Sequence, residues 1–575
     1  MSDVRARAIK ALTATGAQFE LEEITVRGRT LRVFKHAPRS LRSVLEATEQ
    51  HGDRDFLVFR HERVTFAEHR RQVAGLARWL AEQGITKGDR VAIGMRNYPE
   101  WVVGFWAAMS LGAVAVPLNA WWLGPELVYA ITDSGAKALL IDDERWERLE
   151  SSLDELGLAA VAVSRMRAPE RLDGRAASWE QLRSAFGTDT ALPDVDVQPD
   201  DHATIMYTSG TTGQPKGALA THRNHVTNIM NTALFGALAA QIAGNPAAAD
   251  PPPPASLQVF PFFHIGGLTG LYTATAFGSK LVTMYKWDVD EAIDILASEH
   301  ITGTGMVPML LRQLLDSPRL DELPDGALAG ISSGGASVPP DLIRRIEGRF
   351  ESRVSPANGY GLTETTSAII INAGADYFAH PDSIGRPVLG ADVRIVGESG
   401  EELPDGEVGE LHVRGPNIVD GYWNKPGPTA EAFTDGWFHS GDLAYRDGDG
   451  FYYVVDRLKD VVIRGGENVY SSEVEAVLFE HPAIADVAVI GIPDDTYGEE
   501  VVAVANVRPG ATPTVREIQE FSAERLARFK VPTTVLLRDD PLPRTATGKV
   551  LKRELRSEVL GAAGGDAPGG ASDGA

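Results

Sequence analysis

The sequence predicts an α/β fold: a large N-terminal domain of parallel-sheet α/β subdomains plus a β-rich subdomain, then a small α+β C-terminal domain. Amphipathic helices alternate with short apolar strands over residues 66–141, an order that favours parallel sheets flanked by helices. At 575 residues the chain also exceeds a single hydrophobic core, so two or more domains are expected.

The alternating units begin with a helix that starts at residue 66, because Thr65 and Glu68 have the spacing of a capping box. Residues 90–95 and 138–142 are compact apolar runs typical of strands. They predict the first parallel strands of the N-terminal domain.

An uncharged stretch at residues 101–123 has the apolar composition of a transmembrane helix. A span needs about 20 residues of continuous helix, and Gly112 and Pro117 interrupt this one. The stretch therefore favours a buried helix followed by a buried strand, and we predict no transmembrane segment.

The domain division is predicted near residue 459. Upstream, short strands separated by Gly and Asp turns around residues 408–415 indicate the β-rich subdomain. The downstream module is predicted as helix, strand, strand and helix over residues 472–480, 487–490, 501–504 and 515–526. The predicted domains are 1–458, 459–560 and a disordered tail at 561–575, whose Gly, Ala, Asp and Ser residues leave almost nothing to bury.

Composition excludes several classes of protein. The net charge of −24 argues against a nucleic-acid surface and against adhesion to anionic membranes. The absence of cysteine removes disulfides and thiolate metal sites. No apolar signal-peptide core follows the first residues, so we expect a cytoplasmic protein. A homodimer is the default expectation for its assembly.

The most informative motif is a loop at residues 207–217 that is rich in hydroxyls and glycines. Glycines let backbone N–H groups approach phosphate oxygens, hydroxyls add donors, and a lysine adds a full positive charge. A Walker A loop is excluded, because there the lysine precedes Ser or Thr. The predicted phosphate-binding residues are Thr208, Ser209, Gly210, Thr211, Thr212, Gly213 and Lys216.

A second motif, at residues 358–365, combines glycines with an aromatic ring, a hydroxyl and a carboxylate. Tyr360 can stack on a purine, Thr363 can donate to a phosphate, and Glu364 can hold Mg²⁺. A tyrosine-bearing turn with a helix cap at Thr363 explains the same residues equally well. The nucleotide interpretation adds Asn358, Gly359 and Gly361 as binding residues.

A third pair of motifs places Asp442 in a Ser-Gly-Asp sequence and Arg457 shortly afterwards. An acidic residue can hold both hydroxyls of a ribose, and Arg457 can reach a ribose or phosphate oxygen. The plainer alternatives are a turn residue for Asp442 and a surface ion pair for Arg457.

These motifs, in this order, resemble those of the adenylate-forming superfamily, which comprises acyl-CoA synthetases, adenylation domains and luciferases. The resemblance extends from about residue 41 to residue 556 and is greatest to the acyl-CoA synthetase branch, including fatty-acid–CoA ligases. It implies that residues Ser333, Gly334, Gly335 and Ala336 form the adenine-side loop and that Asp442 and Arg457 bind ribose. Asp456 stands where the family often has Gly, a departure that we expect to be tolerated.

The resemblance also implies a mobile C-terminal domain. Lys459 matches the hinge, and Gly465, Gly466 and Glu467 match the loop that helps to form the CoA pantetheine channel. Lys549, in the sequence Thr-Gly-Lys, matches the lysine that bridges the carboxylate and the α-phosphate during adenylation.

The acyl site is predicted around His264, which follows three aromatic residues and a proline. By default such a histidine is a packed residue at a strand end; the resemblance places it at the entrance of the acyl site. Amino-acid-activating relatives carry an aspartate beside it, whereas this chain has Phe263, which disfavours an amine-bearing substrate. Apolar residues at 306–310 and 369–371 would line the pocket.

The predicted function is an AMP-forming acid–thiol ligase that uses ATP, Mg²⁺ and coenzyme A to activate a fatty or other apolar carboxylic acid through an acyl-adenylate. The predicted catalytic residues are Lys549, Glu364, His264 and Lys216. One alternative is an acyl-AMP ligase that transfers its acyl group to a carrier protein. Another, a binding protein with a decayed nucleotide site, is disfavoured because all the charged residues of the motifs are present.

Overall fold

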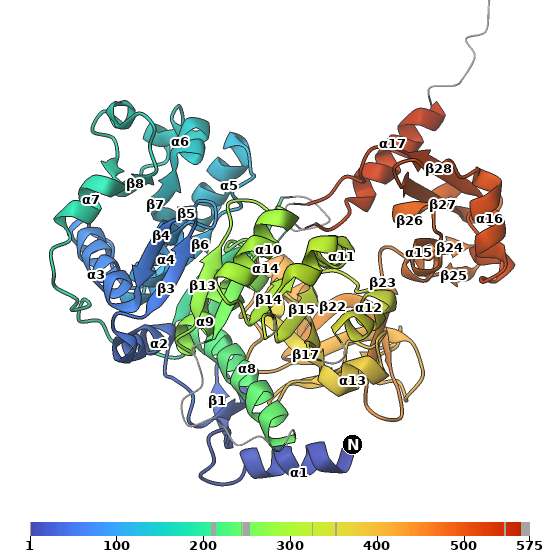
Figure 1. Cartoon of the computed structure of the whole chain (residues 1–575), viewed down its shortest axis with the longest axis horizontal. Helices are drawn as coiled ribbons and strands as arrows, with labels where there is room; N and C mark the ends of the chain where they lie inside the picture. Colours follow the sequence, from blue (N-terminus) through green and yellow to red (C-terminus); the bar gives the residue numbers. More distant parts are fainter. Residues whose placement is uncertain are drawn as a thin grey trace, which may run out of the picture. The chain divides into compact units, whose positions relative to one another are not determined.

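The computed structural model describes residues 2–208, 214–242, 244, 254–324, 326–350, 353–545 and 548–564 (Figure 1). The chain divides into two compact units, one of residues 1–393 with 413–439 and the other of residues 394–412 with 440–575. This division follows packing. The domain boundary predicted near residue 459 stays a prediction.

The first unit contains a seven-stranded sheet with the strand order β11-β10-β6-β5-β7-β8-β9. Its pairings are parallel except for the β10–β11 hairpin. Its strands are β5 (Arg90–Gly94), β6 (Val114–Pro117), β7 (Ala136–Asp142), β8 (Ala160–Ser164), β9 (Ala177–Ser178), β10 (His202–Thr208) and β11 (Lys216–Thr221). The helices along this stretch are α3 (Phe66–Glu82), α4 (Pro99–Ser110), α5 (Gly124–Ser134), α6 (Asp143–Leu149) and α7 (Trp179–Ala185).

A nine-stranded sheet with the order β18-β17-β16-β15-β14-β12-β13-β3-β4 belongs to the same unit. Its central strands are parallel, and antiparallel partners close both edges. The strands are β3 (Asp55–Phe59), β4 (Glu62–Thr65), β12 (Ala255–Gln258), β13 (Lys280–Thr283), β14 (Gly303–Met306), β15 (Gly330–Gly334), β16 (Ser355–Leu362), β17 (Ser367–Ala373) and β18 (Arg386–Pro387). Its helices are α8 (His222–Ile242), α9 (Ile265–Ala276), α10 (Val289–Ser298), α11 (Pro308–Asp316), α12 (Pro340–Phe350) and α13 (Gly374–Ala379).

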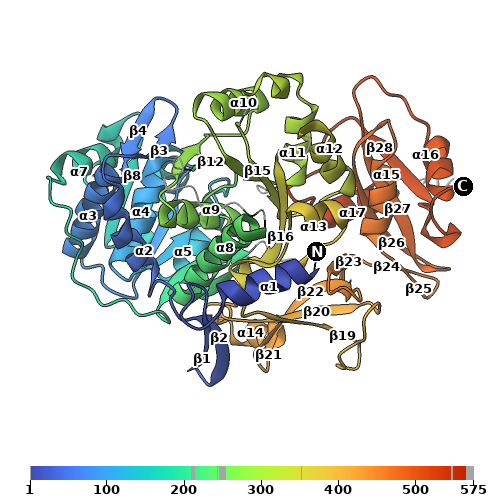
Figure 2. The same ribbon diagram turned by 60° about the horizontal axis from the view of Figure 1, so that its bottom comes forward.

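The N-terminal segment belongs to the first unit. Helix α1 (Ser2–Leu12) packs against α8 (Figure 2). A hairpin of β1 (Leu21–Val26) and β2 (Arg29–Phe34) follows, and then α2 (Leu41–Ala47).

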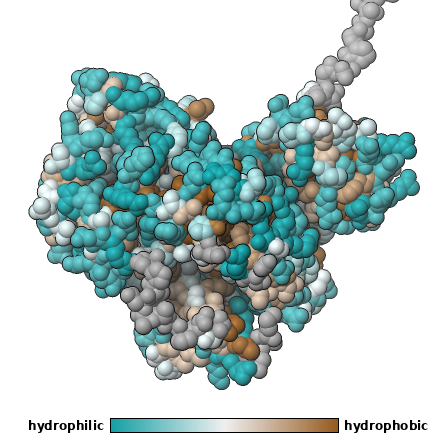
Figure 3. Space-filling view, viewed as in Figure 1, coloured by the Kyte–Doolittle hydropathy of each residue, from teal (hydrophilic) through white to brown (hydrophobic). Residues whose placement is uncertain are grey.

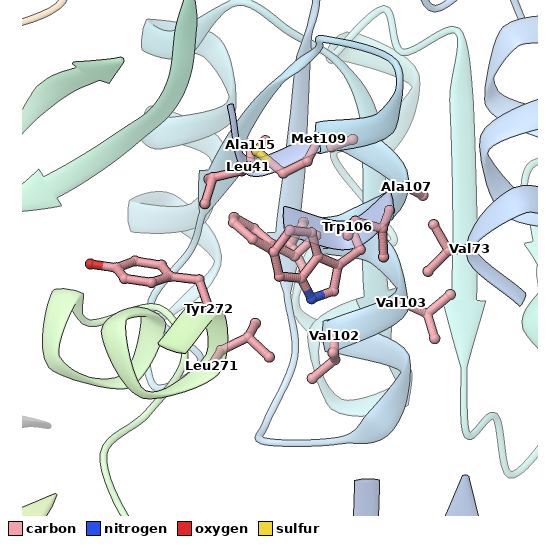
Figure 4. Packing of buried hydrophobic residues seen from close by; sticks show 14 of the residues in the cluster. Leu41, Val73, Val102, Val103, Trp106, Ala107, Met109, Ala115, Leu271 and Tyr272 are labelled. Carbon is pink, nitrogen blue, oxygen red and sulfur yellow. The ribbon is translucent and has the colours of Figure 1, made fainter. Parts of the chain in front are cut away.

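The largest apolar core lies around α4, whose 12 residues are all buried (Figure 4). A helix that is apolar on every side must be covered on every side. Residues of α2, α3 and α9 surround it, together with residues of β3 and β5 from the two sheets. The uncharged stretch is therefore a buried helix followed by the buried strand β6, as predicted, and no helix in the described part of the chain is long and apolar enough to cross a bilayer.

Only one of the two hydrogen bonds of the capping box predicted for α3 forms. Thr65 Oγ1 accepts from Glu68 N at 3.1 Å, which caps the helix. The Glu68 carboxylate accepts instead from Arg71 and Gln72, one turn further along the same helix.

The second unit contains the C-terminal α+β module, in which the predicted order of helix, strand, strand and helix is confirmed. Its sheet has the order β25-β24-β27-β26, with β28 paired to β27. The elements are β24 (Val462–Arg464), β25 (Glu467–Val469), α15 (Ser471–Phe479), β26 (Ile484–Asp494), β27 (Gly498–Val507), α16 (Val515–Ala523), β28 (Thr534–Arg538) and α17 (Lys552–Gly564). Helix α17 includes residues 561–564 of the predicted tail, and residues 565–575 lie outside the described part.

In the chain, the predicted β-rich segment comes after the strands of the nine-stranded sheet and before the C-terminal module. Its elements are β19 (Asp392–Val396), β20 (Gly409–Arg414), α14 (Pro426–Ala432), β21 (Phe433–Thr434), β22 (Trp437–Arg446) and β23 (Tyr452–Arg457). The division between the two units falls inside β19, β20 and β22. Hydrophilic residues dominate the face seen in Figure 3.

The core predicts a matched pair of stability changes. Phe105 is fully buried and packs against Trp101 and Trp106 at ring distances of 5.7 and 5.2 Å. Phe105→Ala should lower the free energy of unfolding by about 3–5 kcal/mol through lost burial and a residual cavity. Phe277 is 40% exposed, so Phe277→Ala should cost less than about 1 kcal/mol. Equal shifts of the two urea unfolding midpoints would contradict this placement of the core.

Candidate active site

Four adjacent strands of the nine-stranded sheet bring several of the predicted site residues to one edge. Strands β12, β14, β15 and β16 are neighbours and mutually parallel, so their carboxyl ends meet at the same edge of the sheet. His264 follows β12, Gly335 and Ala336 follow β15, and Asn358 to Gly361 occupy the end of β16. Ligands of open α/β sheets bind at such an edge.

Close backbone approach explains the glycines here. Gly334 pairs with Gly359 across β15 and β16, and a Cβ on Gly334 would lie 3.0 Å from the Gly359 carbonyl oxygen. A Cβ on Gly361 would lie 1.9 Å from the carbonyl oxygen of Ser367. Gly335 has a φ of +77°, which side-chain-bearing residues rarely adopt.

His264 forms the N-cap of α9. Its Nδ1 accepts from Gly266 N at 3.1 Å, and its ring stacks on Phe260 at 5.8 Å between centroids. This bond places the ring proton on Nε2. Burial lowers the pKa of His264 to about 4, so the imidazole is neutral at neutral pH.

Two residues that sequence reasoning missed hold the backbone before His264. Asn97 Nδ2 donates to Phe260 O at 3.0 Å, and Asn97 Oδ1 accepts from Phe262 N at 2.9 Å. Gln258 Nε2 donates to the same Phe260 carbonyl at 2.6 Å. Asn97 follows β5 in the other sheet, so no pattern in the sequence could have paired it with this loop.

Thr208 and Lys216 stand opposite each other in the β10–β11 hairpin. The hairpin therefore holds both ends of the predicted phosphate loop in register. Ser209, Gly210, Thr211, Thr212 and Gly213 lie outside the described residues.

Tyr422 connects Lys216 with Glu364 and was also missed by the sequence analysis. Its hydroxyl donates to Glu364 Oε1 at 2.7 Å, and the Lys216 ammonium lies 5.2 Å from its ring centroid, a cation–π distance. Burial, followed by the Glu364 charge, raises the pKa of Tyr422, so the phenol stays protonated and donates. Tyr422 reaches this position because residues 419–423 run beside β11, where Leu219 N donates to Gly421 O and Trp423 N donates to Gly217 O.

Glu364 lies in a short 3₁₀ turn, Thr363–Thr365, and is buried. The hydroxyl that closes this turn belongs to Thr365, which accepts from Leu362 N at 2.8 Å and donates to Ser367 O. The turn is therefore capped without using the Thr363 hydroxyl.

In the second unit, strands β22 and β23 place Asp442 opposite Arg457, and Arg457 Nε lies 3.0 Å from Asp442 Oδ1. Asp442 is buried, so this is more than a surface ion pair. Lys549 is close enough to Asp442 and Arg457 for their charges to act on its pKa. Burial, together with the charges of Arg457 and Lys459, lowers its pKa to about 8.

Gly465 and Gly466 form the exposed turn between β24 and β25. Their φ angles are +60° and +87°, so the turn requires a glycine-like conformation at both positions. Gly465 N donates to Tyr497 O at 2.7 Å. Glu467, exposed, begins β25.

Comparison with known proteins gives consistent matches. The family model described as AMP-binding enzyme matches residues 44–423, and that of the AMP-binding enzyme C-terminal domain matches residues 473–549. A feruloyl-CoA synthase from Amycolatopsis sp is 38% identical over 86% of this chain and 93% of its own. The long-chain-fatty-acid–CoA ligase FadD13 of Mycobacterium tuberculosis is 32% identical over 86% and 93%. The ATP-bound structure of MatB from Rhodopseudomonas palustris is similar with a TM-score of 0.79 and 30% identity over 90% of this chain and 98% of that one.

The chain belongs to the AMP-binding enzyme family of the adenylate-forming superfamily. Within it, the chain falls in the acyl-CoA synthetase branch and is an AMP-forming acid–thiol ligase. The fold class and the family predicted from sequence are thereby confirmed.

The site geometry predicts that one Gly→Ala change lowers ATP affinity and that another leaves it unchanged. Gly361→Ala would force a Cβ into the Ser367 carbonyl and displace the end of β16, so ATP affinity should fall by tenfold or more, about 1.4 kcal/mol. Gly348 lies in α12 with open space around it, so Gly348→Ala should leave binding unchanged and slightly stabilise the helix. Calorimetric titration of ATP into both variants checks this, and unaltered affinity in Gly361→Ala would contradict the close approach.

Proposed function

We propose that the protein ligates a fatty or other apolar carboxylic acid to coenzyme A through an acyl-adenylate, consuming ATP and releasing AMP and pyrophosphate. The observation that carries this proposal is the common edge of β12, β14, β15 and β16. There His264, the adenine-side loop and the Tyr360 motif meet in one unit that also holds the Lys216–Tyr422–Glu364 chain.

The preference for an apolar acid rests on the surroundings of His264. Phe263 stands where an amine-binding carboxylate would be needed, and its ring contacts Trp121 at 5.3 Å. Met306 ends β14 and Val307 follows it on the same edge of the sheet, and Ile369 is buried on β17. A ferulate-like aromatic acid and a fatty acid, named in the two relatives described above, both suit such a lining.

In the first half-reaction, a carboxylate oxygen of the acid attacks the α-phosphorus and pyrophosphate leaves. The protein aligns the reactants and stabilises charge. Thr208, Lys216 and the loop between them would hold the β- and γ-phosphates, with Thr363 donating to a phosphate. Asn358 and Tyr360 would contact adenine, Asp442 and Arg457 the ribose, and the Lys549 ammonium would bridge the carboxylate and the α-phosphate.

Glu364 fits a hard divalent cation, because its buried carboxylate offers oxygen ligands and the Tyr422 hydroxyl orients it. Mg²⁺, when bound there, would neutralise phosphate charge.

In the second half-reaction, the CoA thiol attacks the acyl carbonyl and AMP leaves. Neutral His264 at the acyl entrance would orient the reacting groups, and the turn at Gly465, Gly466 and Glu467 would contact pantetheine. A rotation about Lys459 would exchange Lys549 for this turn between the half-reactions.

The decisive experiment incubates the protein with Mg²⁺-ATP and a pool of aromatic and aliphatic acids, with and without CoA, and identifies products by mass spectrometry. Acyl-CoA formed only with CoA supports the proposal and identifies the acid. Acyl-AMP that accumulates unchanged in both reactions contradicts CoA as acceptor and favours a carrier protein. Absence of both products, in a protein that binds ATP, contradicts an apolar acid.

The lowered pKa of Lys549 predicts a pH dependence for adenylation. The ammonium is the active form, so kcat/KM for ATP–pyrophosphate exchange should be level below about pH 7 and fall about tenfold per pH unit above about pH 8. Lys549→Arg keeps its charge at all these pH values, so its lower activity should not show the fall. The same decline in Lys549→Arg would assign the pH dependence to another group.

A further inference from the structure

A buried polar cluster in the second unit is centred on Asp456, at the end of β23 and three residues before the predicted hinge Lys459. Asp456 is 6% exposed. Its Oδ1 accepts from Arg457 N at 2.7 Å and from Ser471 Oγ at 3.3 Å, and its Oδ2 accepts from Ser472 N at 3.3 Å. The carboxylate therefore caps the start of α15, where free N–H groups favour negative charge.

Lys552 of α17 completes the cluster. Its Nζ donates to Ser471 Oγ at 2.6 Å and lies 2.8 Å from Glu475 Oε1. Burial acts to lower the pKa of Lys552, but the charges of Glu475 and Asp456 outweigh it and raise that pKa. A buried ammonium thus faces two carboxylates, and each charge depends on the others, because an unpaired buried charge is costly.

The members of this cluster stand on opposite sides of Lys459 in the chain. Asp456 precedes it, whereas Ser471, Ser472, Glu475 and Lys552 follow it. A rotation about Lys459 would leave Lys552 with Glu475 and Ser471, since all three move together. It would take Asp456 away from both serines and from the ammonium.

The same arrangement places Lys549 in the field of Asp442 and Arg457. Asp442 and Arg457 precede the hinge, and Lys549 follows it. The cluster is therefore assembled when Lys549 is near the residues assigned to ribose.

We propose that Asp456 is a positioning residue that latches the C-terminal module in the arrangement for adenylation and is released when the module turns for thioester formation. The assignment of the two arrangements to adenylation and to thioester formation rests on the proposed function. The latch itself is a contact across Lys459 that needs no substrate.

The first test separates the half-reactions in Asp456→Asn and Asp456→Gly. Asp456→Gly serves as the test if Asp456→Asn does not fold, because glycine is frequent at this position in the family that the sequence resembles. ATP–pyrophosphate exchange should slow about tenfold, as expected for loss of one charge-assisted buried bond. Thioester formation from added acyl-adenylate and CoA should keep its rate or increase. Equal loss in both half-reactions would make Asp456 merely structural and overturn the proposal.

Glu473→Gln is the matched control. Glu473 lies on α15 and pairs with Lys530 at 2.7 Å, and both residues follow Lys459. This carboxylate-to-amide change removes an ion pair that does not cross the hinge, so both half-reaction rates should stay unchanged. A split like that of Asp456→Asn would overturn the assignment of the latch to Asp456.

The second test needs no substrate and so separates failure of the latch from failure of the proposed function. The chain has no cysteine, so Ser399→Cys and Thr512→Cys, both exposed and on opposite sides of Lys459, can be labelled without background. The distance distribution between the labels should be narrow in the parent protein and in Glu473→Gln, and broader or shifted in both Asp456 variants. An unchanged distribution in the Asp456 variants would overturn the latch, whatever the enzyme assays show.

Discussion

Parallel pairing of β12, β14, β15 and β16 is the constraint on which the edge with the candidate site depends. Parallel strands end on the same side, so the segments that follow them are brought together although they are far apart in the chain. Gly334 and Gly359 allow the last two strands to pair closely, and Gly335 allows the chain to turn away immediately. Different residues in the segments after these strands would keep the sheet but would remove the hydrogen-bond donors of the candidate site.

Packing of α4 secures the sheets that carry this edge. A helix buried on all sides must be met by apolar surface from several elements, and here residues of both sheets contribute. Asn97, which lies just before α4, then reaches the backbone before His264 through two hydrogen bonds. The proposed acyl entrance is therefore held by a residue that follows a strand of the other sheet.

The second unit shows a different use of burial. Asp442 and Arg457 pair within a β-hairpin, while the Asp456 cluster joins this hairpin to α15 and α17. Buried ionic groups contribute less to stability than apolar packing of the same volume would. They break and re-form as discrete contacts, however, which suits the two arrangements about Lys459 that we propose for this module.

The sequence alone determined the alternation of helices and strands, the burial of residues 101–123, the family, and most residues of the nucleotide motifs, because these depend on local periodicity and on short, closely spaced groups. Tertiary structure alone decided which distant residues contact one another. Tyr422 beside Glu364, Asn97 beside Phe260 and Lys552 beside Ser471 join segments 58 to 163 residues apart. Such pairs follow from strand order and helix packing, and no local pattern encodes either. For the same reason the lowered pKa of Lys549 could not be foreseen, since it depends on burial and on which charges folding brings near.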